Sequence, residues 1–261
     1  MFRPRRERLK GQSFNRMIPN ILTMLALCSG LTAFRFAFDE KWEPAVLCIV
    51  IAAVLDALDG RVARLLKQTS KFGAELDSLS DFFAFGVAPA MLLYLWTLHE
   101  SGSVGWVIAL FYCVCCALRL ARFNTALEAP SLPLWAKNYF TGVPSPAAAG
   151  LVLLPVIVSF QTDAPFAREP IVAAGFLLVV GALMVSQLPT FSFKNARIPF
   201  RSMKFLLLIV ALLAAFAVAL PWQTLSVLLA LYIVLLPFGW TSFHRLKREA
   251  DTYHTQSTPD H

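Results

Sequence analysis

The amino-acid sequence predicts an all-α integral membrane protein with about eight transmembrane helices. The 261 residues are 57% hydrophobic and have a mean hydropathy of +0.63. Apolar runs of roughly 17–25 residues, the length that crosses a bilayer as a helix, recur along nearly the whole chain. Lys and Arg gather between these runs, so the formal charge of +7 indicates membrane flanks and not nucleic-acid binding.

Turn and charge clusters set the boundaries of the predicted spans. We place these spans at residues 17–38, 43–65, 76–98, 104–124, 143–160, 169–188, 204–220 and 223–243. They form a membrane domain at residues 17–243, with a basic arm at residues 1–16 and a polar tail at residues 244–261. The first span lacks a small-residue cleavage site, so we expect it to be retained.

The basic residues also predict the orientation. Of the 23 Lys and Arg residues, 20 lie in the N-terminal arm, the C-terminal tail and the loops around residues 61–71, 119–137 and 194–204. The opposite loops, DEKWE, HESGS and QTDAP, are acidic or neutral. By the positive-inside rule both termini face the cytoplasm, and we expect a multi-pass protein of the inner (cytoplasmic) membrane. The basic arm is expected to attach to anionic headgroups.

The five cysteines all lie within apolar runs, with no histidine close enough in sequence to suggest a zinc site. Three of them form the CVCC cluster at residues 113–116. We interpret this cluster as small packing residues and not as a redox or metal centre.

Four aspartates lie on a regular spacing in the segment DALDGRVARLLKQTSKFGAELDSLSD. Asp56 and Asp59 are three apart near the end of the second span, and Asp77 and Asp81 are four apart at the start of the third. Each pair therefore lies on one helix face, and the short basic linker makes the two helices antiparallel so that the pairs can meet. Carboxylates that converge in a region of low dielectric repel one another and need cations.

Oxygen-only ligands favour a hard ion such as Mg²⁺ or Mn²⁺, and two such ions on shared carboxylates are typical of phosphoryl chemistry. The alternative is that the aspartates are interfacial residues paired with nearby basic side chains, namely Arg61, Arg64, Lys67 and Lys71. Three small residues lie beside the aspartates, namely Gly60, Ala63 and Gly73. They either allow a bulky ligand to approach the backbone or serve ordinary packing between membrane helices.

The spacing D-x-x-D-G-x-x-A-R, eight residues, then G-x-x-x-D-x-x-x-D runs from Asp56 to Asp81. It is similar to the complete signature of the CDP-alcohol phosphotransferase family, helical-bundle membrane enzymes that displace CMP from a CDP-linked donor with an alcohol. The segments DFFAFGVAPA, RLARFN, FTGVPSPAAAG and LPTFSFK resemble the bacterial phosphatidylserine synthases of that family. The resemblance covers roughly residues 15–200, and the final two spans contribute little to it.

The resemblance implies two divalent ions, Mg²⁺ or Mn²⁺, held by Asp56, Asp59, Asp77 and Asp81, with Asp81 also the general base for the acceptor hydroxyl. It implies CDP-diacylglycerol and L-serine as substrates, membrane lipids as surroundings and a homodimer. Residues expected to contact the CDP-lipid are Pro19, Asn20, Gly60, Ala63, Arg64, Ser70 and Gly73. Pro19 and Asn20 are also ordinary helix-start residues.

The residues that would bind the acceptor are less sharply defined. Arg119 and Arg122 are three apart at the end of the fourth span, with Asn124 beside them, which is a suitable place for a serine carboxylate or a lipid phosphate. Both arginines could instead be membrane anchors that reach the headgroups. Ser145 is a further candidate, although Pro144 and Pro146 already explain its segment as a break before a span.

Three other functions remain open on the sequence. Another member of the same family would make phosphatidylglycerol phosphate, phosphatidylinositol phosphate or phosphatidylcholine with the same aspartates. An ion-coupled transporter would spread its acidic residues through the bilayer depth and interrupt its helices near the midplane. A non-catalytic scaffold would leave the spacing of the aspartates without a purpose.

Overall fold

The computed structural model describes residues 17–66, 70–128, 139–162, 165–186, 189–191 and 203–236. The predicted basic arm, the polar tail, Lys67 and the end of the last predicted span lie outside these residues. Apart from three short helical turns, the helices are α1 (Ile18–Phe38), α2 (Trp42–Leu65), α3 (Lys71–Asp81), α4 (Ala88–Trp96), α5 (Gly102–Glu128), α6 (Ser145–Val152), α7 (Leu154–Ser159), α8 (Pro170–Val185), α9 (Met203–Ala219) and Pro221–Leu236.

These helices confirm the all-α membrane class. The segments Ile18–Phe38, Lys71–Trp96 and Leu98–Ala126 are long and apolar enough to cross a bilayer. Shorter apolar helices follow at Pro170–Val185, Leu207–Ala219 and Pro221–Leu236. Each predicted span coincides with a helical segment, while the number of segments that cross the membrane stays a prediction.

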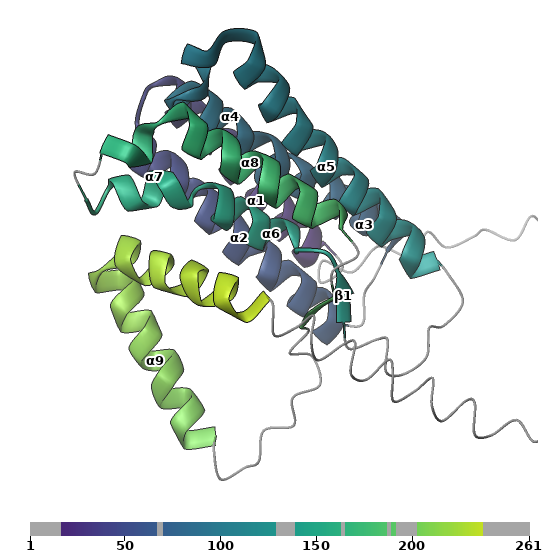
Figure 1. Ribbon diagram of the computed structural model, residues 1–261. Coiled ribbons are helices and arrows are strands. Elements are labelled where there is room, and N and C mark those ends of the chain that lie inside the picture. The colour runs from purple at the N-terminus through teal and green to yellow at the C-terminus, as the bar shows by residue number, and fades with distance from the viewer. Residues whose placement is uncertain are drawn as a thin grey trace, which may run out of the picture.

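Helix α1 packs along α2 through a stripe of small residues (Figure 1). The stripe follows helical spacing, which places all of its members on one face. Small side chains let two membrane helices approach closely, so α1 can lie directly against the helix that carries Asp56 and Asp59. The buried residues of α1 are Pro19, Thr23, Ala26, Gly30, Ala33 and Ala37.

The helix that contains the third predicted span, residues 76–98, starts earlier, at Lys71, and changes its helical form directly after Asp81. A π-helical turn, η2 (Phe82–Val87), joins α3 to α4. The buried hydroxyl of Tyr112 on α5 donates to the carbonyl oxygen of Phe85 at 3.0 Å, so a polar group of this irregular turn is satisfied inside the bundle. Turns of this kind often occur beside functional sites, and this one follows the last aspartate of the signature.

The fifth predicted span is divided into α6 and α7, which meet at Leu153. A short antiparallel ribbon precedes it, in which β1 (Tyr139–Thr141) pairs with β2 (Pro189–Phe191), with Phe140 opposite Thr190. The all-α prediction did not include this ribbon. Strand β1 includes the first two residues of FTGVPSPAAAG, and β2 lies within LPTFSFK, so two segments of the family resemblance pair in space.

The last two helices differ in how they meet the rest of the bundle. Every α9 side chain whose burial is described is exposed, and α9 stands away from α1 to α8 (Figure 1). The helix Pro221–Leu236, drawn in yellow-green, packs against the core with one face, on which Leu229 is 8% exposed. This face carries Trp222, Leu225, Leu229, Tyr232 and Leu236.

Candidate active site

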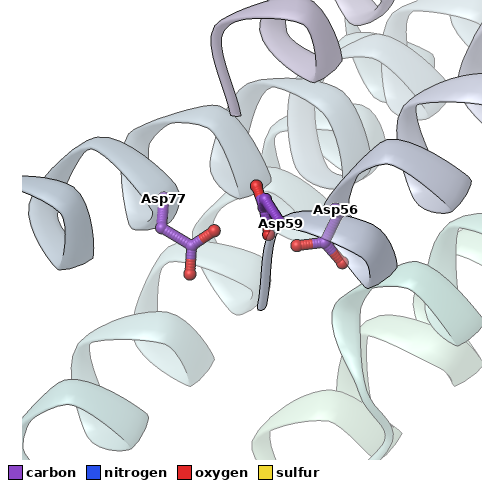
Figure 2. A group of neighbouring side chains, drawn as sticks. All are labelled: Asp56, Asp59 and Asp77. Atoms are coloured by element: carbon purple, nitrogen blue, oxygen red, sulfur yellow. The ribbon is translucent and has the colours of Figure 1, made fainter. Parts of the chain in front are cut away.

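Three of the four predicted aspartates form one carboxylate cluster. Asp56 and Asp59 lie near the C-terminal end of α2, and Asp77 lies on α3. One carboxylate oxygen of each lies within 4.8 Å of the others, and the side chains approach one another from the two helices (Figure 2). Asp59 is only 5% exposed, so this cluster is part of the interior and not a solvated acidic surface.

Asp81 lies at the edge of this cluster, at the last residue of α3. It is outside the group of three, but its carboxyl is within hydrogen-bonding reach of that of Asp56 and in electrostatic contact with Asp77. Arg119 on α5 interacts electrostatically with both Asp81 and Asp56. Asp81 is therefore in contact with the carboxylate cluster and with the arginine of α5.

The ion-pair alternative for the aspartates has no support among the described residues. None of the four aspartates there forms a salt bridge with Lys or Arg. Arg61 and Arg64, which the alternative requires, instead donate to carbonyl oxygens of their own helix, at Ala57 (2.8 Å) and Gly60 (2.9 Å). Four partly buried carboxylates that have Arg119 near them but form no salt bridge among the described residues keep an excess of negative charge. Such a cluster is suited to bind a divalent cation through oxygen, as Mg²⁺ and Mn²⁺ require.

Helix α1 supports the carboxylate cluster through Thr23. The buried hydroxyl of Thr23 donates to Oδ2 of Asp59 at 2.7 Å. The carbonyl oxygen of Pro19 lies 3.1 Å from the same hydroxyl. Ser80 on α3 donates to the carbonyl oxygen of Thr23 at 3.1 Å, so one residue of α1 connects both aspartate helices. The sequence analysis missed Thr23, although a polar residue on the small-residue stripe of α1 is a detectable signal.

Pro19 and Asn20 lie where the predicted lipid-binding residues meet. Ser70 caps α3 by accepting a hydrogen bond from the backbone N–H of Gly73 at 2.9 Å. A methyl group at Gly73 would lie 2.9 Å from Oδ1 of Asn20 and 3.1 Å from Oγ of Ser70. The start of α1 therefore covers the start of α3, and Gly73 is small because Asn20 approaches it closely.

The side of α2 that carries Gly60 is open. A methyl group at Gly60 would meet no atom within 4 Å, so protein packing does not require a glycine there. Gly60 and Arg64 are exposed and Ala63 is half-buried. Room beside the carboxylates, next to a guanidinium, suits a phosphorylated ligand.

The four residues predicted to bind the acceptor occupy two different places. Nη1 of Arg119 donates to Oγ of the fully buried Ser145, which joins α5 to the start of α6. Arg122 donates to the carbonyl oxygen of Val185 at 2.9 Å, at the C-terminal end of α8. Asn124 donates through its side-chain amide to Ser78 on α3 at 2.8 Å. The structure thus brings Arg119 and Ser145 together beside Asp81, whereas Arg122 and Asn124 connect helices.

Comparison with protein families identifies the chain. Residues 16–186 match the sequence model described as CDP-alcohol phosphatidyltransferase, a stretch that includes all four aspartates. The chain belongs to this family. The family resemblance predicted from the aspartate spacing is therefore confirmed. A second model, described as CDP-alcohol phosphatidyltransferase 2, matches residues 204–237, the segment in which the sequence analysis found little resemblance.

Several curated proteins are similar to this CDP-alcohol phosphatidyltransferase over most of its length. A CDP-diacylglycerol–serine O-phosphatidyltransferase from Mycobacterium leprae is 35% identical over 87% of this chain and 77% of its own. A protein of the same name from Helicobacter pylori is 34% identical over 84% of this chain and 88% of its own length. Another from Bacillus subtilis is 37% identical over 68% of this chain and 92% of its own length.

Proposed function

We propose that this protein transfers the phosphatidyl group of CDP-diacylglycerol to the hydroxyl of L-serine and releases CMP. The observation that carries the proposal is the carboxylate cluster of Asp56, Asp59 and Asp77, which the family signature places on two adjoining helices. The names of the similar proteins from three bacteria support serine as the acceptor.

The carboxylate cluster, with Asp81 at its edge, would hold two divalent ions, Mg²⁺ or Mn²⁺. Its donor set is oxygen only, and among the described residues only Arg119 opposes its charge, without a salt bridge, which fits hard cations. When bound, such ions neutralise the diphosphate and stabilise the charge on the departing CMP. The hydrogen bond from Thr23 fixes the orientation of Asp59, as outer residues do at metal sites.

Asp81 is proposed as the general base. A serine hydroxyl is a poor nucleophile near neutral pH, so a carboxylate must accept its proton as the new bond forms. The serine oxygen then bonds to the phosphorus that carries the diacylglycerol, and the bond from that phosphorus to the oxygen of CMP breaks. Asp81 is suited to this role because it interacts both with the cluster and with Arg119, which is proposed to bind the acceptor.

The donor would lie over the open side of α2. Gly60 and Ala63 leave space for the diphosphate, and Arg64 supplies a guanidinium for it. The nucleotide would extend toward the contact between α1 and α3, formed by Pro19, Asn20, Ser70 and Gly73.

The acceptor would lie on the α5 side of Asp81. Arg119 and Ser145 are proposed to bind serine there, because they meet beside the proposed base. Arg122 and Asn124 act as positioning residues, since they attach α5 to α8 and α3. The active site and both termini are proposed to face the cytoplasm from the inner membrane, and the protein is proposed to form a homodimer.

An acceptor panel tests this function. Purified protein with CDP-diacylglycerol and Mg²⁺ or Mn²⁺ should release CMP when serine is added. Glycerol 3-phosphate, inositol phosphate and choline should not support release. CMP release with one of these acceptors and not with serine would reject the serine assignment while keeping the family chemistry.

A further inference from the structure

Two buried polar atoms beside the proposed acceptor site lack hydrogen-bond partners. Among the described residues, these atoms are Nε of Arg119 and the hydroxyl oxygen of Tyr232. Buried polar atoms are nearly always paired, so an unpaired one needs an explanation such as a ligand. The helix Pro221–Leu236 packs against α6, the helix whose first residue, Ser145, is bonded to Arg119, so Tyr232 and Arg119 belong to the same part of the bundle. The two side chains also interact electrostatically.

Tyr232 reaches this neighbourhood because the helix Pro221–Leu236 is docked on the bundle. Leu229, three residues before it, lies so close to α6 that a methyl group at Gly150 would come within 2.8 Å of its Cδ2. In the first half of the same helix, Gln161 donates to the carbonyl oxygen of Trp222 at 3.1 Å and to Oγ of Ser226 at 2.7 Å. Because Gln161 meets Trp222 and Ser226 while the earlier Gly150 meets Leu229, the helix runs antiparallel to α6 and α7, and Tyr232 lies about one turn beyond Leu229 toward the start of α6.

The orphaned atoms define the ligand chemistry. Arg119 offers an N–H donor with a full positive charge, and Tyr232 offers an O–H donor. Nη1 of the same guanidinium is already bonded to Ser145, which fixes the direction of its free Nε–H. Two donors, one of them cationic, suit a planar anion with two oxygens, so a carboxylate can satisfy both.

We propose that Tyr232, from the last described helix, is a specificity-determining residue that binds the carboxylate of the amino-acid acceptor together with Arg119. This inference rests on the proposed function. The proposal gives the helix Pro221–Leu236 a role in choosing the acceptor. This helix lies within residues 204–237, which the second family model matches. Because Arg119 also faces Asp81, an acceptor held by its carboxylate can direct its hydroxyl toward the proposed base.

The test compares the Tyr232→Phe variant with the unchanged protein on serine and on ethanolamine, which is serine without its carboxylate. Loss of one hydrogen bond to a charged group should raise the KM for serine roughly tenfold to a hundredfold. The KM for CDP-diacylglycerol, kcat at saturating serine and thermal stability should stay near those of the unchanged protein. The preference for serine over ethanolamine should fall by the same factor as the KM rises.

Tyr94→Phe is the matched control, because Tyr94 packs edge-on against Trp106 with ring centroids 5.3 Å apart, away from Arg119. It should leave the KM for serine and the KM for CDP-diacylglycerol unchanged.

An unchanged KM for serine and an unchanged serine preference in Tyr232→Phe would reject the role of Tyr232 but not the proposed function. A raised KM for CDP-diacylglycerol instead would assign the two donors to the lipid phosphate and overturn the carboxylate assignment. No CMP release with serine by the unchanged protein would reject the proposed function itself.

Discussion

The carboxylate side and the acceptor side of the site are assembled from the chain in different ways. Asp56, Asp59 and Asp77 come from two helices joined by a short linker, within about a tenth of the sequence. Arg119, Ser145 and Tyr232 come from three helices that are far apart in sequence. The first group is fixed by helical spacing, and the second exists only after the bundle has packed.

This difference separates what the two sides do. The carboxylate side holds the groups that the proposed phosphoryl chemistry needs, and it coincides with the family signature. On the acceptor side, Ser145 and Tyr232 come from helices that carry none of the aspartates, whereas Arg119 interacts with Asp56 and Asp81. We infer that transfer chemistry and acceptor choice are separable, and four substitutions test this from the largest expected effect to the smallest.

Asp81→Asn should reduce kcat by about 10²- to 10⁴-fold, because the amide cannot accept the serine proton. The KM for CDP-diacylglycerol should change much less, since the cluster of three aspartates remains. Steady-state CMP release measures both constants. Asp39→Asn is the control, because Asp39 pairs with Lys41 on the exposed surface at 3.7 Å. A near-normal kcat in Asp81→Asn would rule out Asp81 as the base.

Thr23→Val should weaken metal binding and leave the acceptor side unchanged. The substitution removes the donor to Asp59 at nearly constant volume, and such outer hydrogen bonds are worth about 10- to 100-fold in metal affinity. The Mn²⁺ concentration for half-maximal activity should rise by that factor, with an unchanged KM for serine. Thr32→Val is the control on the same helix, since Thr32 donates to the carbonyl oxygen of Cys28 on the exposed side. Equal effects of the two variants would contradict this role of Thr23.

Gly60→Ala should affect substrate binding and stability in opposite directions. Alanine favours a helix over glycine by about 1 kcal/mol, and the added methyl meets no protein atom within 4 Å, so thermal stability should rise slightly. The KM for CDP-diacylglycerol should rise severalfold because the methyl occupies space proposed for the diphosphate. Gly175→Ala on α8 is equally unhindered and should change stability only. If the two variants have the same KM, the donor does not lie over Gly60.

Arg122→Ala should have the smallest effect on the reaction. It removes the donor to the carbonyl oxygen of Val185, so the free energy of unfolding should fall by about 1–3 kcal/mol. The KM for serine should change less than in Tyr232→Phe. Thermal denaturation and serine titration distinguish the two roles. A larger rise in the KM for serine than in Tyr232→Phe would make Arg122 an acceptor ligand.

The sequence predicted the carboxylate side because its information is local. Helical spacing placed Asp56 beside Asp59 and Asp77 beside Asp81, and the short linker brought the two helices together. Helical spacing could not predict that Asp77 lies inside the group of three while Asp81 lies at its edge. That difference depends on how α2 and α3 are rotated relative to each other. The divalent ion itself stays a proposal.

The acceptor side was predicted only in part. Arg119 and Arg122 are three apart, so helical spacing predicts that both lie on one face of their helix. Only the packing of α6 and α8 gives them different partners. Tyr232 was not predicted, since nothing near it in sequence indicates that it meets Arg119. The ribbon of β1 and β2 was missed for the same reason, because each strand has only three residues.

The central claim is that the carboxylate cluster makes phosphatidyl transfer to serine dependent on a divalent cation. The direct measurement is serine-dependent CMP release by protein treated with a chelator and then supplied with one cation at a time. We predict that activity is lost on chelation and returns with Mn²⁺ or Mg²⁺, whereas Ca²⁺, which is larger and less demanding in geometry, restores it poorly. Full activity in the absence of any divalent cation would contradict the account.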